Sequence, residues 1–328
     1  MKELQQELNN GLLQSVYLLY GEEAYLKNQF EQKIKRACLH DGDTINFHQY
    51  EGKGIAVGEI IDLAQTMPFF AEKRLILLKD TGFFKSACDE LADYISEVPE
   101  TACLLFVEEE VDKRTRLYKA VKKAGKIVEF KSQNEKTLTT WILSILKKEG
   151  KQITQADLRL FLEKTGMDMN NIRQELEKLI CYTYERSVIT RADIENICTS
   201  QITNQIFDMI NAMAERKQKK ALDLYYNLLA LKEAPLKILA LINRQFNLLM
   251  QVKDLLRLGR DKSEIASKAG LPPFFVGRYI SQSQGFTMEQ LRCALEDSVQ
   301  AEEDVKMGNL ADQLSVELLI VKYSSQIE

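Results

Sequence analysis

The hydrophobic pattern along the first 132 residues alternates short apolar runs with longer amphipathic stretches. The apolar runs are typical of strands buried on both faces of a sheet and predict strands at 16–20, 46–50, 75–78, 103–107 and 127–130. Stretches rich in Lys and Glu lie between them and predict helices, as over 25–35. Alternation of this kind predicts an α/β domain with a mostly parallel sheet.

Beyond residue 132 the pattern becomes helical. Three helix starts are predicted where a hydroxyl residue is followed three positions later by an acid, as in a capping box: Ser132 with Glu135, Thr154 with Asp157, and Thr190 with Asp193. From residue 206 onward only long amphipathic helices are indicated. We therefore predict three domains: an α/β domain over 1–132, a small helical bundle over 133–205 and a second all-helical domain over 206–328.

One short stretch interrupts this pattern. Helical spacing over 60–64 predicts a helix that ends before Pro68, because proline disfavours the α conformation of the preceding residue. Phe69 and Phe70 then stand where a polar turn is expected, just before the strand predicted at 75–78. Neighbouring positions do not face one core, so at least one ring is expected to point outward. Either the rings cap the domain core, or they form a protruding wedge that fills a partner's pocket.

Composition excludes several classes of protein. The 328 residues carry 44 basic and 48 acidic side chains, for a net charge of −4, so tight independent binding to nucleic acid is not expected. The basic runs at 216–220 and 113–126 are interpreted as solvated surface, with contact to a DNA backbone in an assembly as the alternative. No apolar run approaches the about 20 residues of a membrane span, and the acidic start lacks the apolar region of a signal peptide. We expect a cytoplasmic protein with no membrane contact.

Candidate catalytic and metal-binding groups are few. The six cysteines are scattered without a CxxC pair, and the only histidines are His40 and His48, so free thiols are expected and a zinc site is not. A serine nucleophile elbow and an activated cysteine are both missing from the sequence. We predict that the chain has no catalytic residue of its own and binds no cofactor and no metal.

The turn after the first predicted strand is the place to test for a nucleotide site. A phosphate-binding loop there needs GxxxxGK[ST], whereas this chain has Gly21-Glu22-Glu23-Ala24-Tyr25-Leu26-Lys27-Asn28. Two carboxylates stand where phosphate would bind, and Lys27 is not followed by a hydroxyl residue for magnesium. The acidic run at 108–110 could hold a metal, but is interpreted as a solvated loop. The domain is therefore predicted to have the fold of an NTPase but to lack the residues that bind phosphate and magnesium.

Residues 264–276 have the helix, glycine turn and helix of a helix-turn-helix. A reader of base edges needs polar or basic residues early in its second helix. This second helix begins Pro-Pro-Phe-Phe-Val-Gly, and Arg278 is its first basic residue. We expect it to pack within the helical domain.

The interrupted stretch resembles the wedge segment of the delta subunit family of the bacterial DNA polymerase III clamp loader. In that family a small or polar residue, an aliphatic residue and two large apolar residues precede a basic-apolar strand. The corresponding positions here are Met67, Pro68, Phe69 and Phe70, followed by Glu72-Lys73-Arg74 and the predicted strand. The resemblance extends over essentially the whole chain and is strongest at 16–26, 65–80 and 160–182.

The resemblance implies an AAA+-like α/β domain without a phosphate-binding loop, followed by a helical lid domain and a helical collar that joins subunits into a ring. It implies that Phe69 and Phe70 enter a pocket on the beta sliding clamp, supported by Gln65, Met67 and Pro68. The implied partners are this clamp, ATPase and delta-prime-type clamp-loader subunits that hydrolyse ATP, and primed DNA in the assembled complex. A helix-turn-helix DNA-binding protein and a degenerate AAA+ ATPase are the alternatives.

Overall fold

The computed structural model describes residues 2–198 and 202–325. By its internal contacts the chain divides into two compact units, Met1–Thr140 and Trp141–Glu328. No helix among the described residues is both long enough and apolar enough to cross a membrane.

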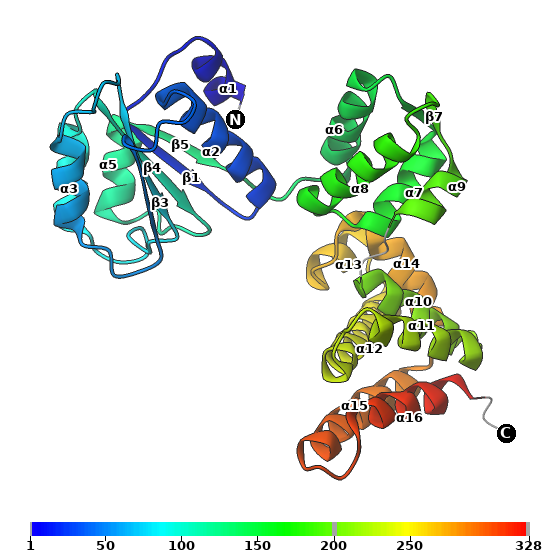
Figure 1. Cartoon of the computed structure of the whole chain (residues 1–328). Helices are drawn as coiled ribbons and strands as arrows, with labels where there is room; N and C mark the ends of the chain where they lie inside the picture. The colour runs from blue at the N-terminus through cyan, green and yellow to red at the C-terminus, as the bar shows by residue number, and fades with distance from the viewer. Residues whose placement is uncertain (1, 199–201, 326–328) are drawn as a thin grey trace. The chain divides into compact units, whose positions relative to one another are not determined.

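A five-stranded sheet forms the centre of the first unit (Figure 1). Its strands pair in the order β2-β3-β4-β1-β5, and every pairing is parallel. The three central strands are almost wholly buried, as their continuous apolar sequences predict. The strand bounds are β1 Val16–Tyr20, β2 Phe47–Glu51, β3 Arg74–Lys79, β4 Ala102–Glu108 and β5 Lys126–Glu129.

Helices cover both faces of this sheet (Figure 1). Ile60 and Val121 are among the helical residues that pack with Leu18, Leu78 and Phe106 of the sheet on one face. Side chains alternate between faces along a strand, so the intervening residues face α2 instead. The helices are α1 Lys2–Asn9, α2 Ala24–Cys38, α3 Val57–Gln65, α4 Asp89–Tyr94, the 3₁₀ helix η1 Ile95–Glu97 and α5 Arg116–Ala124.

The second unit is helical, and α6 (Glu135–Lys148) runs into it from the first. Its first part contains α7 Gln155–Thr165, α8 Met169–Tyr182 and α9 Arg191–Ile197, with a short parallel pair, β6 Gln152–Ile153 and β7 Val188–Ile189, that the sequence pattern did not predict. Thr154 and Thr190 cap α7 and α9 as predicted. The predicted cap at Ser132 is wrong: its hydroxyl donates to Glu22 at 2.6 Å, and Asn134 accepts from the Thr137 amide at 2.9 Å.

The remainder of this unit packs around α12, the longest helix described. Ile242, Phe246 and Leu249 of α12 are fully buried among residues of the neighbouring helices. An all-parallel α/β unit followed by helices confirms the predicted fold class. The helices are α10 Ile202–Ala214, α11 Gln218–Ala230, α12 Pro235–Arg257, α13 Lys262–Lys268, α14 Pro273–Gln284, α15 Met288–Lys306 and α16 Asp312–Ser324.

Candidate functional site

The turn between α3 and β3, residues 66–73, is here called the wedge turn. α3 ends at Gln65, and β3 begins at Arg74. Phe70 is 93% exposed, Phe69 is 56% exposed and Met67 is 71% exposed. The two rings meet edge to face with their centroids 4.6 Å apart. Both rings therefore lie outside the core of their unit, in contrast to the interpretation in which they cap it.

The other predicted site residues lie beside the rings. Gln65 is exposed at the last position of α3, and Pro68 is partly exposed within the turn. The Thr66 hydroxyl donates to the Asp62 carbonyl at 2.8 Å and closes the helix end. The five predicted residues, which lie within six consecutive positions, are therefore all at least partly exposed.

Phe70 has an unusual backbone conformation. Its φ of +49° lies in the left-handed region, which costs a residue with a Cβ roughly 1–2 kcal/mol. Such a conformation persists where the surrounding structure imposes it, and it is found most often at functional sites. Hydrogen bonds from Arg74 and Asn46 hold the backbone of Met67 and Phe69, just before Phe70.

The first of these anchors is the side chain of Asn46, just before β2. The Phe69 amide donates to Asn46 Oδ1 at 2.7 Å, and Asn46 Nδ2 donates to the Phe69 carbonyl at 2.9 Å. Asn46 is 1% exposed, and its Nδ2 also donates to the Asp43 carboxylate at 2.8 Å. Hydrogen bonds from Asn46 lower the pKa of Asp43, and the bond from the Asn46 side chain is the largest cause. One buried carboxamide therefore satisfies both backbone groups of Phe69.

The second anchor is Arg74, the first residue of β3. Its guanidinium is buried and donates to the Leu63 carbonyl at 3.1 Å and to the Met67 carbonyl at 3.2 Å. Leu63 lies in the last turn of α3, and its carbonyl also accepts from the Thr66 amide at 3.3 Å. Arg74 thereby ties the end of α3 to the start of the wedge turn.

Sequence reasoning placed Arg74 in the family pattern but assigned the anchoring role to neither Arg74 nor Asn46. The available signals were an arginine at the start of an otherwise apolar strand and the Asp43-x-x-Asn46 spacing before another strand. A buried arginine needs hydrogen-bond partners, and Asp with Asn is typical of turns. Neither signal names a partner, because Phe69 lies 23 residues from Asn46.

The turn from β1 into α2, residues 21–27, is here called the nucleotide turn because a phosphate-binding loop would occupy it. Two of its backbone amides are already used: Gly21 donates to the Glu109 carbonyl at 3.1 Å, and Glu23 donates to the Phe130 carbonyl at 3.1 Å. A Cβ at Gly21 would lie 2.3 Å from that same Phe130 oxygen. The backbone of residue 130 thus packs directly against the start of the nucleotide turn.

The charged groups around the nucleotide turn are also used within the unit. Lys27 is buried and donates to the Glu108 carbonyl at 3.0 Å, and burial lowers its pKa. The Glu108 carboxylate, predicted as solvated, is instead buried and accepts from the Thr81 hydroxyl at 2.6 Å and amide at 3.1 Å. Burial raises the pKa of Glu108. Neither group is free to hold a nucleotide or its metal.

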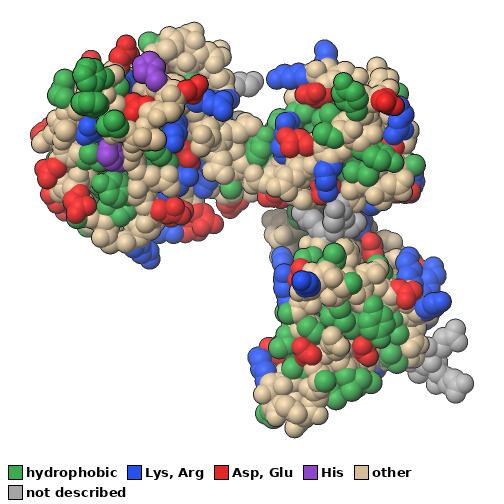
Figure 2. Space-filling view, viewed as in Figure 1, with side chains coloured by type: hydrophobic (Ala, Val, Ile, Leu, Met, Phe, Trp, Pro, Cys, Tyr) green, Lys and Arg blue, Asp and Glu red, His purple; other side chains and the backbone are tan. Residues whose placement is uncertain are grey.

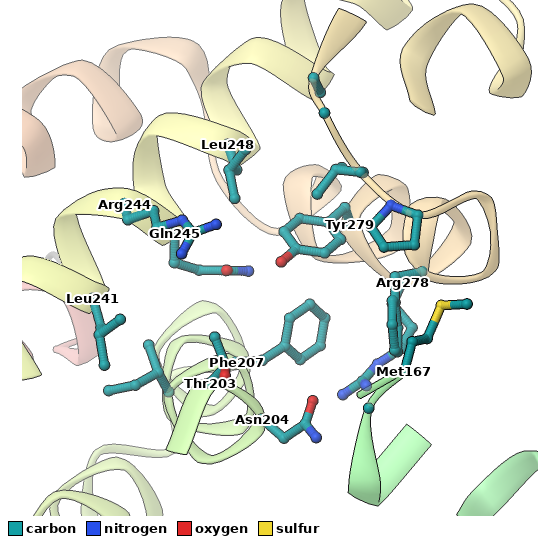
Figure 3. Close-up of a pocket in the computed structure, with 17 residues that line it drawn as sticks. Met167, Thr203, Asn204, Phe207, Leu241, Arg244, Gln245, Leu248, Arg278 and Tyr279 are labelled. Atoms are coloured by element: carbon teal, nitrogen blue, oxygen red, sulfur yellow. The ribbon is translucent and has the colours of Figure 1, made fainter. Parts of the chain in front are cut away.

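The predicted helix-turn-helix corresponds to α13 and α14. Arg278 of α14 points into a pocket of about 260 Å³ inside the helical unit (Figure 3). Its guanidinium lies 4.1 Å from the Phe207 ring centroid and 3.6 Å from the Asp208 carboxylate. The first basic side chain of the second helix is therefore engaged within its own unit, which favours packing over the reading of bases.

Comparison with known proteins identifies the family. A family model described as "DNA polymerase III, delta subunit" matches residues 17–131, which include both turns, and one for the C-terminal domain of that subunit matches 203–323. DNA polymerase III subunit delta of Bacillus subtilis is 31% identical over 329 residues, covering 96% of this chain and 94% of the relative. The chain belongs to the DNA polymerase III delta subunit family.

Two further relatives of this delta-family chain agree. A probable DNA polymerase III subunit delta of Aquifex aeolicus is 23% identical, covering 80% of this chain and 77% of the relative. The solved structure of the Bacillus subtilis DNA clamp loader delta protein is similar with a TM-score of 0.70 at 27% identity, and 99% of each chain is covered. The resemblance drawn from the sequence is confirmed: the chain is a clamp-loader delta subunit of DNA polymerase III and takes part in DNA replication.

Proposed function

We propose that this delta-family chain binds the beta sliding clamp through Phe69 and Phe70 and opens the clamp for loading onto primed DNA. Met67 adds apolar contact, and Gln65 and Pro68 support the edge of the surface. The observation that carries the proposal is the nearly full exposure of Phe70 on a turn whose backbone is held from two sides. Aromatic anchors of this kind supply most of the binding energy at protein interfaces.

The energy available from the wedge turn comes from the burial of its two exposed rings. Burying one such ring contributes on the order of 2–3 kcal/mol. Opening requires that the rings bind the open clamp more tightly than the closed one, since equal affinity for both states shifts nothing.

Hydrolysis of ATP is assigned to ATPase partners, with a delta-prime-type subunit completing the loader in the cytoplasm. This assignment is supported by the nucleotide turn, where the Gly21 and Glu23 amides and the Lys27 side chain are used internally. Residues 133–205 then act as a lid domain and 206–328 as a collar. Figure 2 shows hydrophobic side chains at the surface of the helical unit, and Leu314 and Leu318 lie exposed one turn apart on α16. An apolar stripe of this kind suits contact with a neighbouring collar.

A distance reporter across the subunit interface of the clamp tests the opening. The wild-type chain is expected to increase the distance between two fluorophores placed on either side of that interface, and the Phe69→Ala, Phe70→Ala double variant is not. Tyr184→Ala is the matched control, because Tyr184 is also a highly exposed aromatic residue but lies far along the chain. Equal opening by the double variant, or none by the wild type, would exclude the proposal.

Nucleotide turnover separates this proposal from the degenerate ATPase. The isolated chain is expected to release no phosphate from ATP above background. Steady turnover that disappears in Lys27→Met would show that the nucleotide turn works as an ATPase site after all.

A further inference from the structure

We propose that Asn46 is a positioning residue of the wedge turn, which holds Phe69 and Phe70 in their binding arrangement before the clamp arrives. This inference rests on the proposed function of the two rings. Asn46 touches the backbone of Phe69 and not the clamp itself, so it acts through the rings.

The chemistry of a carboxamide suits this role. It carries a donor and an acceptor side by side, and these match the carbonyl and amide of one residue in the way a neighbouring strand would. Asn46 gives such a pair of hydrogen bonds to Phe69, five positions before the β3 pairing begins at Arg74. Phe69 is thereby held like a strand residue although it lies outside the sheet.

Asp43 fixes which way the Asn46 amide faces. An ionised carboxylate only accepts hydrogen bonds, so the NH₂ of Asn46 must turn toward Asp43 Oδ2, 2.8 Å away. This leaves Oδ1 for the Phe69 amide. The other Asp43 oxygen accepts from the amides of Ile45 and Asn46 at 3.1 and 3.0 Å and holds the turn itself. The orientation is therefore set within the chain and needs no partner.

The side chain and backbone of Asn46 serve different purposes. The backbone carbonyl accepts from the Leu75 amide at 2.9 Å and so belongs to the β2–β3 edge. The hydrogen bonds of the side chain reach Asp43 and Phe69 of the wedge turn. Removing the side chain leaves the sheet pairing in place and frees Phe69 and the left-handed Phe70 beside it. A loop that must be ordered on binding loses affinity, because binding then includes the entropic cost of that ordering.

A double-mutant cycle with the purified sliding clamp tests this role. Asn46→Ala in the full chain is expected to weaken clamp affinity about tenfold, the size expected for the loss of two hydrogen bonds. In the Phe69→Ala, Phe70→Ala background the same change is expected to alter the remaining affinity less than about twofold. An effect of equal size in both backgrounds would show a general structural role and overturn the inference.

Two further measurements keep the test decisive. Hydrogen exchange at the Phe69 amide is expected to accelerate in Asn46→Ala, with the amides of buried β4 unchanged. Asn46→Asp preserves the volume and the acceptor for the Phe69 amide but removes the donor and faces the Asp43 carboxylate, so weakened binding is expected there too. It serves as the test where the alanine variant does not fold.

The outcomes distinguish the inference from the proposed function. If the ring variant loses clamp binding while Asn46→Ala and Asn46→Asp bind like the wild type, the positioning role is wrong and the function of the rings stands. If the ring variant itself binds like the wild type, the proposed function is wrong.

Discussion

The wedge turn and the nucleotide turn lie at opposite ends of the strands of one parallel sheet. Their backbone groups differ in where they find hydrogen-bond partners. The wedge turn precedes β3, and side chains from outside it, Asn46 and Arg74, satisfy its backbone. Its apolar side chains are left outside. The nucleotide turn follows β1, and carbonyls of residues 109 and 130 take up two of its amides. The Lys27 side chain, which could bind phosphate, is buried within the unit.

The comparison shows what makes a turn available to a partner. Every buried backbone donor and acceptor needs a hydrogen-bond partner. Where side chains supply those partners, the turn is rigid and its own side chains are free to bind. Where neighbouring strands supply them, the turn becomes part of the core. The same sheet therefore carries a candidate binding surface at one end of its strands and, at the other end, a turn packed against residues 109 and 130.

The largest effect on stability is expected at the nucleotide turn. Gly21→Ala places a Cβ against the Phe130 carbonyl at a φ of +121°, so the free energy of unfolding should fall by at least about 3 kcal/mol. Gly52→Ala is the matched control, since its φ of +86° meets open space and should cost only about 1 kcal/mol. Denaturant unfolding measures both. Equal losses would mean that the nucleotide turn is not closed by residue 130.

The next effect concerns the second anchor of the wedge turn. Arg74→Met removes the hydrogen bonds to the Leu63 and Met67 carbonyls and should lower the free energy of unfolding by about 2–3 kcal/mol. Arg74→Lys should not recover this loss, because an ammonium lacks the fork that reaches two carbonyls. A stability within about 0.5 kcal/mol of wild type for Arg74→Met would contradict the anchoring role.

The pH dependence of stability should differ in sign between two carboxylates that lie beside the two turns, Glu108 beside the nucleotide turn and Asp43 beside the wedge turn. Beside the nucleotide turn, burial raises the folded-state pKa of Glu108 above its ordinary value of 4.5. The folded state then binds the proton more tightly, so this residue lowers stability as pH rises from 4.5 through the raised pKa. Glu108→Gln keeps an acceptor for Thr81 and should be more stable than wild type at neutral pH and equal to it in acid. Urea unfolding across that range checks this, and an unchanged slope would count against it.

A smaller pH effect on stability, of opposite sign, is expected from Asp43 beside the wedge turn. Hydrogen bonds from Asn46 lower the folded-state pKa of Asp43 below its ordinary value of 3.8. The contribution of Asp43 is therefore complete above 3.8 and is lost as pH falls through the lowered pKa. Asp43→Asn should remove this acid-side loss, and NMR titration of the Asp43 carboxyl measures the pKa directly. A value at or above 3.8 would contradict the network.

Sequence reasoning predicted the elements that local pattern determines. The short continuous apolar runs at β1, β3 and β4 are typical of buried strands, and the caps at Thr154 and Thr190 lie within one helical turn. The two-residue strand β6 was missed because it is too short to show a period. The cap at Ser132 failed because Glu22, 110 residues away, takes its hydroxyl.

The candidate site was predicted in its side chains but not in its support. Two adjacent phenylalanines after Pro68 are visible in the sequence, yet spacing alone left open whether they face the core or solvent. Their exposure depends on Asn46, which reaches Phe69 across 23 residues, and on the buried contacts of Arg74. Such contacts depend on the pairing of β2, β3 and β4, which no local pattern specifies.

The most direct test of the account is the affinity of the full chain for purified sliding clamp, measured by titration calorimetry for three proteins. The Phe69→Ala, Phe70→Ala variant is predicted to bind at least about 100-fold more weakly than the wild type, because two rings lose their burial. Tyr184→Ala, the exposed aromatic control, is predicted to bind like the wild type. An affinity of the double variant within about threefold of wild type, a difference of less than about 1 kcal/mol, would contradict the claim that the held, exposed rings bind the clamp.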